Sequence, residues 1–115
     1  MKKRDYRDYV RDIIDSLNDI EAFVDNASYS DFLKDKKTIN AVVRSIEIMG
    51  EAVKKLPLAL KNKYHSIPWK KIAGMRDKLI HEYFGVDLEI LWTAAKRDVP
   101  LLREKMLELS KEAGG

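Results

Sequence analysis

His81 and the residues around it are the part of the sequence best suited to chemistry. Arg76 precedes His81 by five positions, Asp77 precedes it by four, and Tyr83 follows it by two. A histidine titrates near neutral pH, so it can take a proton from a ribose 2′-hydroxyl or give one to a leaving oxygen. An arginine keeps its charge and can grip a phosphate. These residue types suit metal-independent cleavage of RNA, whose 2′-hydroxyl is the internal nucleophile.

The spacing by itself supports this chemistry only weakly. A histidine at a helix end, paired with an acid and without a chemical role, accounts for the same residues. On an ideal helix, Asp77 and His81 share a face, so Asp77 could orient His81 and set its tautomer. Arg76 and His81 lie about 140° apart. They converge only if the arginine wraps round the helix, if the helix loosens near its end, or if a second subunit completes the site.

Helical periodicity dominates the elements that must position these residues. Apolar residues recur at the three-and-four spacing of a helix face, and no segment shows the sustained alternation of a β-strand. The expected helices run from Tyr6 to Val24, from Phe32 to Leu56, from Pro68 to a stop at Gly85, and from an Asp87 cap to Leu109. We therefore expect an all-α, up-and-down bundle of about four main helices, with a short connector helix within residues 57–67.

Three residues make specific predictions within these helices. Pro57 ends the second helix, because a proline disfavours helical geometry in the residue before it. Gly50, inside that helix, marks a close contact with another helix, since a glycine there otherwise costs stability. Pro100 kinks the last helix.

Length and composition indicate one domain over residues 1–115. There is no cysteine, which excludes disulfides, thiolate metal sites and a cysteine nucleophile. The basic start has no apolar run behind it, so we expect no signal peptide, and no stretch is long and apolar enough for a membrane span. We expect a cytoplasmic protein without a metal or another cofactor.

Positive charge is concentrated between Lys54 and Lys78. This segment contains eight basic residues and one acid, Asp77, whereas the net charge of the whole chain is only +3. Such a segment can attract nucleic acid, and Lys70, Lys71 and Lys78 are the candidate RNA-binding residues. The alternative is that they are ordinary solvated lysines. The second histidine, His65, is interpreted as a surface or turn residue, and Trp69 and Trp92 as core residues.

The wider pattern resembles a known family. The segments Ala41–Pro57 and Ile67–Trp92 are similar to the HepT-like branch of the HEPN proteins. That family's signature is an arginine, a polar residue, three variable residues and then histidine-any-tyrosine, which matches Arg76 to Tyr83. Further similarities are the Arg–x–x–Glu at Arg44 and Glu47, the stretch Gly50–Ala52, the pair Pro68 and Trp69, the pair Val86 and Asp87, and Trp92. The resemblance covers about residues 5–110.

The resemblance implies a homodimeric helical bundle that acts as a metal-independent endoribonuclease toxin. Arg76 and His81 would be catalytic and Asp77 supporting, with the motifs of both subunits near the two-fold axis. It also implies an antitoxin partner, a minimal nucleotidyltransferase that transfers AMP to Tyr83, as in type VII-like toxin–antitoxin pairs. The substrate would be a tRNA or an mRNA. The alternative function is a non-catalytic helical subunit that binds nucleotide or substrate for a nucleotidyltransferase, and a purely structural dimer is a third.

Overall fold

The computed structural model describes residues 5–81 and 85–112, except for the side chains of Ile80 and His81. Its elements are α1 (Tyr6–Val24), α2 (Tyr29–Lys34), α3 (Lys36–Lys55), α4 (Leu58–Lys63), α5 (Trp69–Leu79), β1 (Ile80–His81), β2 (Gly85–Val86), α6 (Leu88–Thr93), a π-helical segment (Ala94–Asp98) and α7 (Val99–Glu112). Helices make up nearly all of this fold, which confirms the all-α class.

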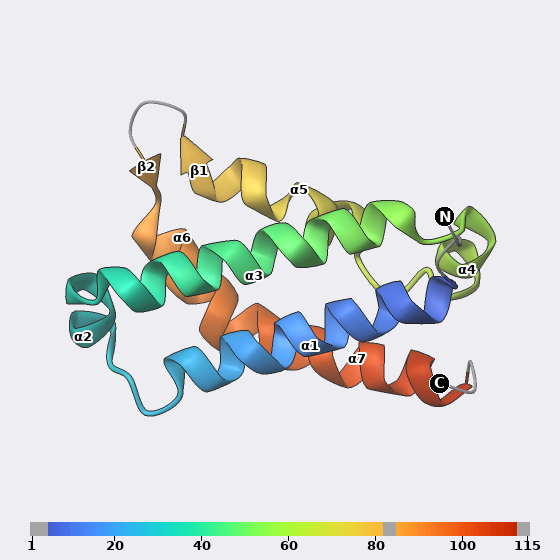
Figure 1. Cartoon of the computed structure of the whole chain (residues 1–115), viewed down its shortest axis with the longest axis horizontal. Coiled ribbons are helices and arrows are strands. Elements are labelled where there is room, and N and C mark those ends of the chain that lie inside the picture. The colour runs from blue at the N-terminus through green and yellow to red at the C-terminus, as the bar shows by residue number, and fades with distance from the viewer. Residues whose placement is uncertain (1–4, 82–84, 113–115) are drawn as a thin grey trace.

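The long helices α1 and α3 form the centre of the bundle (Figure 1). On α1, the residues of one face are buried, because their three-and-four spacing brings them to the same side of the helix: Val10, Ile13, Leu17, Ile20 and Val24. Helix α7 packs against α1, and α5 packs against α3. The four main helices are thus α1, α3, α5 and the run from α6 to α7.

The helix expected from Phe32 to Leu56 is two helices, so that prediction was wrong at Asp35. The Asp35 carboxylate accepts hydrogen bonds from the Thr38 backbone N–H at 3.1 Å and from the Thr38 hydroxyl at 2.6 Å. Asp35 therefore caps α3, and an N-cap residue leaves helical geometry. These bonds, the hydroxyl bond first, also lower the pKa of Asp35 below its usual value. Phe32 is buried as expected, but on α2.

Several other helix boundaries and contacts agree with the sequence. Helix α3 ends just before Leu56 and Pro57, and α4 is the expected connector helix. A Cβ built on Gly50 would lie 3.4 Å from the carbonyl oxygen of Ala73, so the close contact of α3 with α5 is confirmed. The Asp87 carboxylate accepts a hydrogen bond from the Ile90 N–H at 3.1 Å and caps α6.

The last expected helix contains a π-helical segment directly before α7. Pro100 lacks an N–H, and its ring collides with the carbonyl group four residues earlier in a regular helix. The wider π-helical turn at Ala94–Asp98 accommodates this conflict. The chain changes direction between α6 and α7 at this point (Figure 1), as the kink expected from Pro100 requires.

Helix α5 stops at Leu79, earlier than expected, and the chain then forms a small hairpin. Strands β1 and β2 pair antiparallel, with Ile80 opposite Val86 and His81 opposite Gly85. The Leu79 carbonyl oxygen accepts a hydrogen bond from the Asp87 N–H at 2.7 Å, an acceptor that a continuing helix would have used itself. Gly85 has a φ of +77° and therefore serves the hairpin rather than a helix end. The expectation of a helix up to Gly85 was wrong, and no pattern in the sequence indicated these two-residue strands.

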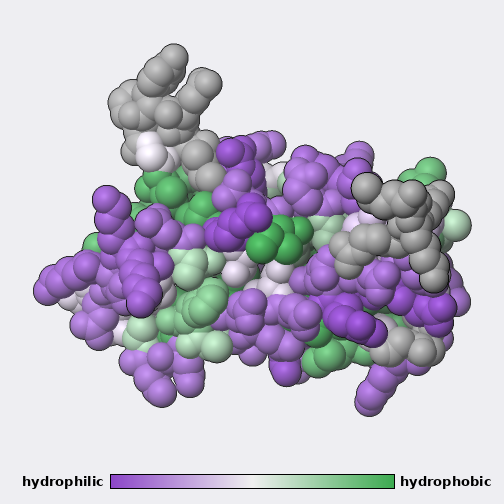
Figure 2. Space-filling view, viewed as in Figure 1, coloured by the Kyte–Doolittle hydropathy of each residue, from purple (hydrophilic) through white to green (hydrophobic). Residues whose placement is uncertain are grey.

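The surface is strongly hydrophilic, as a charged fraction of 36% requires. Figure 2 shows hydrophilic side chains over most of one face, with small hydrophobic areas between them. Among the residues that the structure describes, no helix combines the length and the apolar character needed to cross a membrane.

Candidate active site

Arg76 lies in the last turn of α5. One face of this helix packs against the bundle. Trp69, Ile72, Met75 and Leu79 are buried against the bundle. The indole N–H of Trp69 donates to the carbonyl oxygens of Lys61 and Tyr64, both at 3.1 Å. The interpretation of Trp69 as a core residue is therefore confirmed. These anchors fix α5 and leave the side chain of Arg76 half exposed, at 50%.

Two carboxylates hold the guanidinium group of Arg76. Its Nε donates to Glu47 Oε2 on α3 at 3.2 Å, and its Nη1 lies 3.5 Å from Asp77 Oδ1. An arginine has five N–H donors in a planar fork. Within the described part of the chain, no partner is recorded for Nη2. The guanidinium is thus oriented from one side and still has donors for an incoming phosphate.

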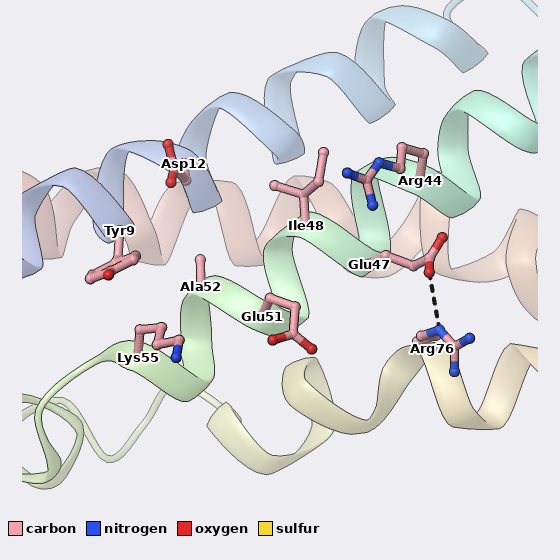
Figure 3. Close-up of a pocket in the computed structure, with 9 residues that line it drawn as sticks. All are labelled: Tyr9, Asp12, Arg44, Glu47, Ile48, Glu51, Ala52, Lys55 and Arg76. Atoms are coloured by element: carbon pink, nitrogen blue, oxygen red, sulfur yellow. Dashed lines mark hydrogen bonds and ion pairs between the residues drawn. The ribbon is translucent and has the colours of Figure 1, made fainter. Parts of the chain in front are cut away.

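Arg76 and Glu47 lie at the mouth of a cleft of about 320 Å³ between α1, α3 and α5. Figure 3 shows the two side chains facing each other between α3 and α5, with Arg44 one helical turn from Glu47. Asp12 and Tyr9 from α1 also line the cleft, so its lining contains both cations and carboxylates. Such a mixed lining can orient an arginine, but it does not by itself attract a polyanion.

His81, the next residue of the motif, follows the end of α5. The backbone of His81 is in β1, so His81 and Arg76 are on different elements and the 140° separation of an ideal helix does not apply. Arg76 and His81 were expected to converge if the arginine wraps round the helix, if the helix loosens near its end, or if a second subunit completes the site. The structure shows that α5 ends between the two residues. The expected shared helix face of Asp77 and His81 was wrong for the same reason. The His81 side chain and all of Tyr83 lie outside the described residues.

Asp77 lies beside Arg76 and is 80% exposed. The Arg76 guanidinium offsets the repulsion that this carboxylate would exert on a phosphate. The role predicted for Asp77, orienting His81, stays a prediction.

The three candidate RNA-binding lysines all lie on α5, but in different surroundings. Lys70 is exposed, and no ion pair is recorded for it among the described residues. Lys71 Nζ lies 3.8 Å from Asp98 Oδ2. Lys78 lines a cleft together with Asp87, Glu89 and Asp98. Lys70 therefore offers the least compensated charge of the three.

Sequence reasoning did not assign a role to Glu47, the residue that holds Arg76. The Arg44–x–x–Glu47 pattern was the available signal, but a pattern within α3 does not show which residue of α5 it faces. The contact follows from the close approach of the two helices at Gly50 and Ala73. Among the side chains that the structure describes, which exclude that of His81, no cluster of three or more histidine, aspartate and glutamate residues could hold a metal ion.

A family model described as ribonuclease HepT-like matches residues 13–109, which includes Arg76, Glu47 and His81. The chain belongs to the HepT-like ribonuclease family. It is 48% identical over 109 residues to a Thermococcus cleftensis protein named "Probable ribonuclease HepT", covering 95% of this chain and 99% of that protein. It is 45% identical over 115 residues to "Putative RNase MJ0127" of Methanocaldococcus jannaschii, covering 100% and 95% of the two chains. No solved structure matches this chain.

Proposed function

We propose that this protein is a metal-independent endoribonuclease whose active site contains Arg76 and His81. The family match across both residues carries the proposal. The exposed, carboxylate-oriented guanidinium of Arg76 supports it. A guanidinium held by Glu47 on one side can bind a phosphate with its remaining donors without first having to be ordered.

The proposed reaction is transesterification within the RNA strand. The ribose 2′-hydroxyl oxygen attacks the adjacent phosphorus, and its proton passes to a general base. The bond from phosphorus to the 5′-oxygen breaks, and that oxygen leaves with a proton from a general acid. His81 supplies the proton transfer, and Arg76 stabilises the charge on the phosphoryl oxygens. The products are a 2′,3′-cyclic phosphate and a 5′-hydroxyl.

The test is cleavage of total RNA by the purified protein in excess EDTA, expressed without a partner and compared with His81→Ala. We expect cleavage by the wild type alone, with 2′,3′-cyclic phosphate ends. Circular dichroism checks that the variant remains folded. Equal cleavage by both proteins would remove His81 from the reaction. Intact RNA in both, with Tyr83 unmodified by mass, would favour the non-catalytic nucleotide- or substrate-binding subunit.

We also propose that the active enzyme is a homodimer. Ile48, in the Arg76 cleft, exposes 39% of its surface, and a second copy would remove such apolar surface from water. Light scattering coupled to size-exclusion chromatography should give twice the monomer mass of 13.3 kDa. A monomer at the concentrations that cleave RNA would contradict this assignment.

We further propose that the protein is the cytoplasmic toxin of a toxin–antitoxin pair, silenced by a nucleotidyltransferase that transfers AMP to the Tyr83 hydroxyl. Bulk and negative charge beside the catalytic pair would exclude and repel an RNA phosphate. Co-expression with a cognate nucleotidyltransferase should add the mass of AMP to the wild type and not to Tyr83→Phe. An unchanged added mass in Tyr83→Phe would move the modification to another residue.

A further inference from the structure

A further cavity, separate from the Arg76 cleft, lies where α4 meets the start of α5. It has a volume of about 480 Å³ and lies at the end of the molecule that α4 occupies in Figure 1. Apolar residues line part of it, among them Val53, Ile67 and Leu58, and Leu58 is 71% exposed. Its charged and titratable lining residues are Lys54, Lys61, Lys70, Lys71 and His65. We call this the α4–α5 cavity. None of the described residues that line it carries a carboxylate.

Three other clefts formed by described residues differ from this cavity in charge, because each places carboxylates beside its cations. Those carboxylates are Asp12, Glu47 and Glu51 in the Arg76 cleft, Asp87, Glu89 and Asp98 between α5 and α6, and Glu21 and Asp25 between α1 and α7. A concave surface lined by one sign of charge focuses the field and concentrates ions of the opposite sign. Of these four hollows, the α4–α5 cavity is therefore the one suited to an anion.

The position of the lysines in α5 strengthens this argument. Lys70 and Lys71 lie in the first turn of α5, and that turn contains no acid. The N-terminus of a helix carries the positive end of the macrodipole, so lysines there are unfavourable for the helix, whereas acids would stabilise it. The lysines thus add positive charge at a place where the fold does not benefit from it.

Two of the four lysines that line the cavity have no acid partner among the described residues, and the other two have only loose ones. Lys61 Nζ donates to the uncharged carbonyl oxygen of Val53 at 3.4 Å, and no ion pair is recorded for Lys70 within the described ranges. Lys54 Nζ lies 3.6 Å from Glu51 Oε1, and Lys71 Nζ lies 3.8 Å from Asp98 Oδ2. Both contacts are longer than a hydrogen bond, and both lysines are exposed, so a phosphate can compete with the carboxylates.

We propose that the α4–α5 cavity is an RNA-binding subsite that takes the phosphodiester backbone of the strand beside the cleavage point. The ammonium groups of Lys70 and Lys61 bind phosphate, and the exposed apolar wall at Leu58 receives a ribose or base. Lys70 and Arg76 are separated by about 9 Å along the axis of α5 and by about 120° around it, so a strand that contacts both has to pass around the surface of this helix. This inference rests on the proposed function, because it assumes an RNA substrate.

The experiment measures binding of the wild-type protein to a single-stranded 2′-O-methyl RNA, which lacks the nucleophile and stays intact. Fluorescence anisotropy gives the Kd at several KCl concentrations. We expect Lys70→Glu to raise Kd about tenfold at 100 mM KCl and to reduce the slope of log Kd against log salt by about one. Lys61→Met should raise Kd less, because it removes one charge without reversing it.

Lys37→Glu is the matched control. Lys37 is the second residue of α3, as Lys70 is of α5, and the start of α3 lies beside α2, at the end of the molecule opposite α4 (Figure 1). Both changes put an acid into the first turn of a helix, which the helix dipole favours, and the thermal midpoint of each variant checks that it stays folded. Lys37→Glu should leave Kd and the salt slope close to those of the wild type.

Three results would overturn the subsite. They are a wild-type Kd and slope in Lys70→Glu, an equal loss in Lys37→Glu, or displacement of the RNA by millimolar AMP, which would assign the cavity to a free nucleotide. Failure of the proposed function gives a different result, since the wild type would then leave ordinary RNA uncut while the lysine variants still weaken binding to the 2′-O-methyl strand.

Discussion

The pair α1 and α3 differs from the segment running from α5 through β1 and β2 in what its side chains do. In the pair, continuous apolar faces are buried over 19 and 20 residues. Helix α5 has 11 residues and is anchored by one buried side, while its free side carries four cations and Asp77. The comparison suggests that the pair supplies stability and that α5 supplies chemistry. Substitutions in the core of the pair should then change the free energy of unfolding, and substitutions on the free side of α5 should change the rate of RNA cleavage.

Removal of Arg76 should have the largest effect. We expect Arg76→Ala to slow RNA cleavage by about 100- to 1,000-fold, the usual loss when one group that stabilises the transition state is removed. Arg76→Lys should recover only part of the rate, because an ammonium keeps the charge but not the planar fork. Single-turnover cleavage measures both rates.

The control for Arg76 is Arg97→Ala, an exposed arginine in the π-helical segment. It should cleave at the wild-type rate. Because the Arg76 ion pair is half exposed, Arg76→Ala should also change the free energy of unfolding by less than about 1 kcal/mol. A large loss of stability in Arg76→Ala would show that α5 also stabilises the fold. It would contradict the division of roles between the α1–α3 pair and α5.

A core substitution in α1 should give the opposite pattern. Leu17 is fully buried, so Leu17→Ala should lower the free energy of unfolding by about 2–5 kcal/mol through lost burial and a residual cavity. The cleavage rate per folded molecule should stay the same at a temperature where the variant is folded. Urea denaturation measures the first quantity and active-site titration the second. Leu101→Ala, at a 62% exposed position, should leave both nearly unchanged.

Glu47 links the two regions, because it belongs to α3 and orients Arg76. Glu47→Ala should lower kcat about tenfold, equivalent to about 1.4 kcal/mol in the barrier, with less effect on KM. Glu47→Gln keeps an oxygen that accepts the Nε–H hydrogen bond and should restore most of kcat. Equal loss in both variants would assign the effect to the negative charge. A wild-type kcat in Glu47→Ala would mean that Arg76 needs no positioning.

The same comparison explains which parts of the structure could be predicted from the sequence. Helix α1 was predicted from end to end, since its apolar spacing is a local property. The break at Asp35 was missed because Phe32 and Ile39 are seven positions apart, two helical turns, so the apolar pattern stays in phase across it.

The end of α5 was missed for a different reason. It depends on the hydrogen bond from the Asp87 N–H to the Leu79 carbonyl oxygen, which joins residues that no helical pattern connects. The types of the candidate catalytic residues were readable from the motif. The partner of Arg76 was not, because the register of α3 against α5 determines it.

The register of α3 against α5 can be tested at two glycines, where we expect smaller changes in the free energy of unfolding than in the core of α1. Gly74 of α5 has no atom within 4 Å of an added Cβ, so Gly74→Ala should raise the free energy of unfolding by about 0.5–1 kcal/mol through helix propensity. At Gly50 the added Cβ would touch the Ala73 carbonyl oxygen at 3.4 Å, so Gly50→Ala should gain less. Gly50→Ile should lower the free energy of unfolding by about 1–3 kcal/mol, because the larger side chain forces α3 and α5 apart. It should also slow RNA cleavage, because the contact of Glu47 with Arg76 lengthens. Urea denaturation and single-turnover cleavage measure these effects. Equal gains at both glycines, with a harmless isoleucine, would mean that α5 adjusts freely against α3 and that the position of Arg76 does not depend on this contact.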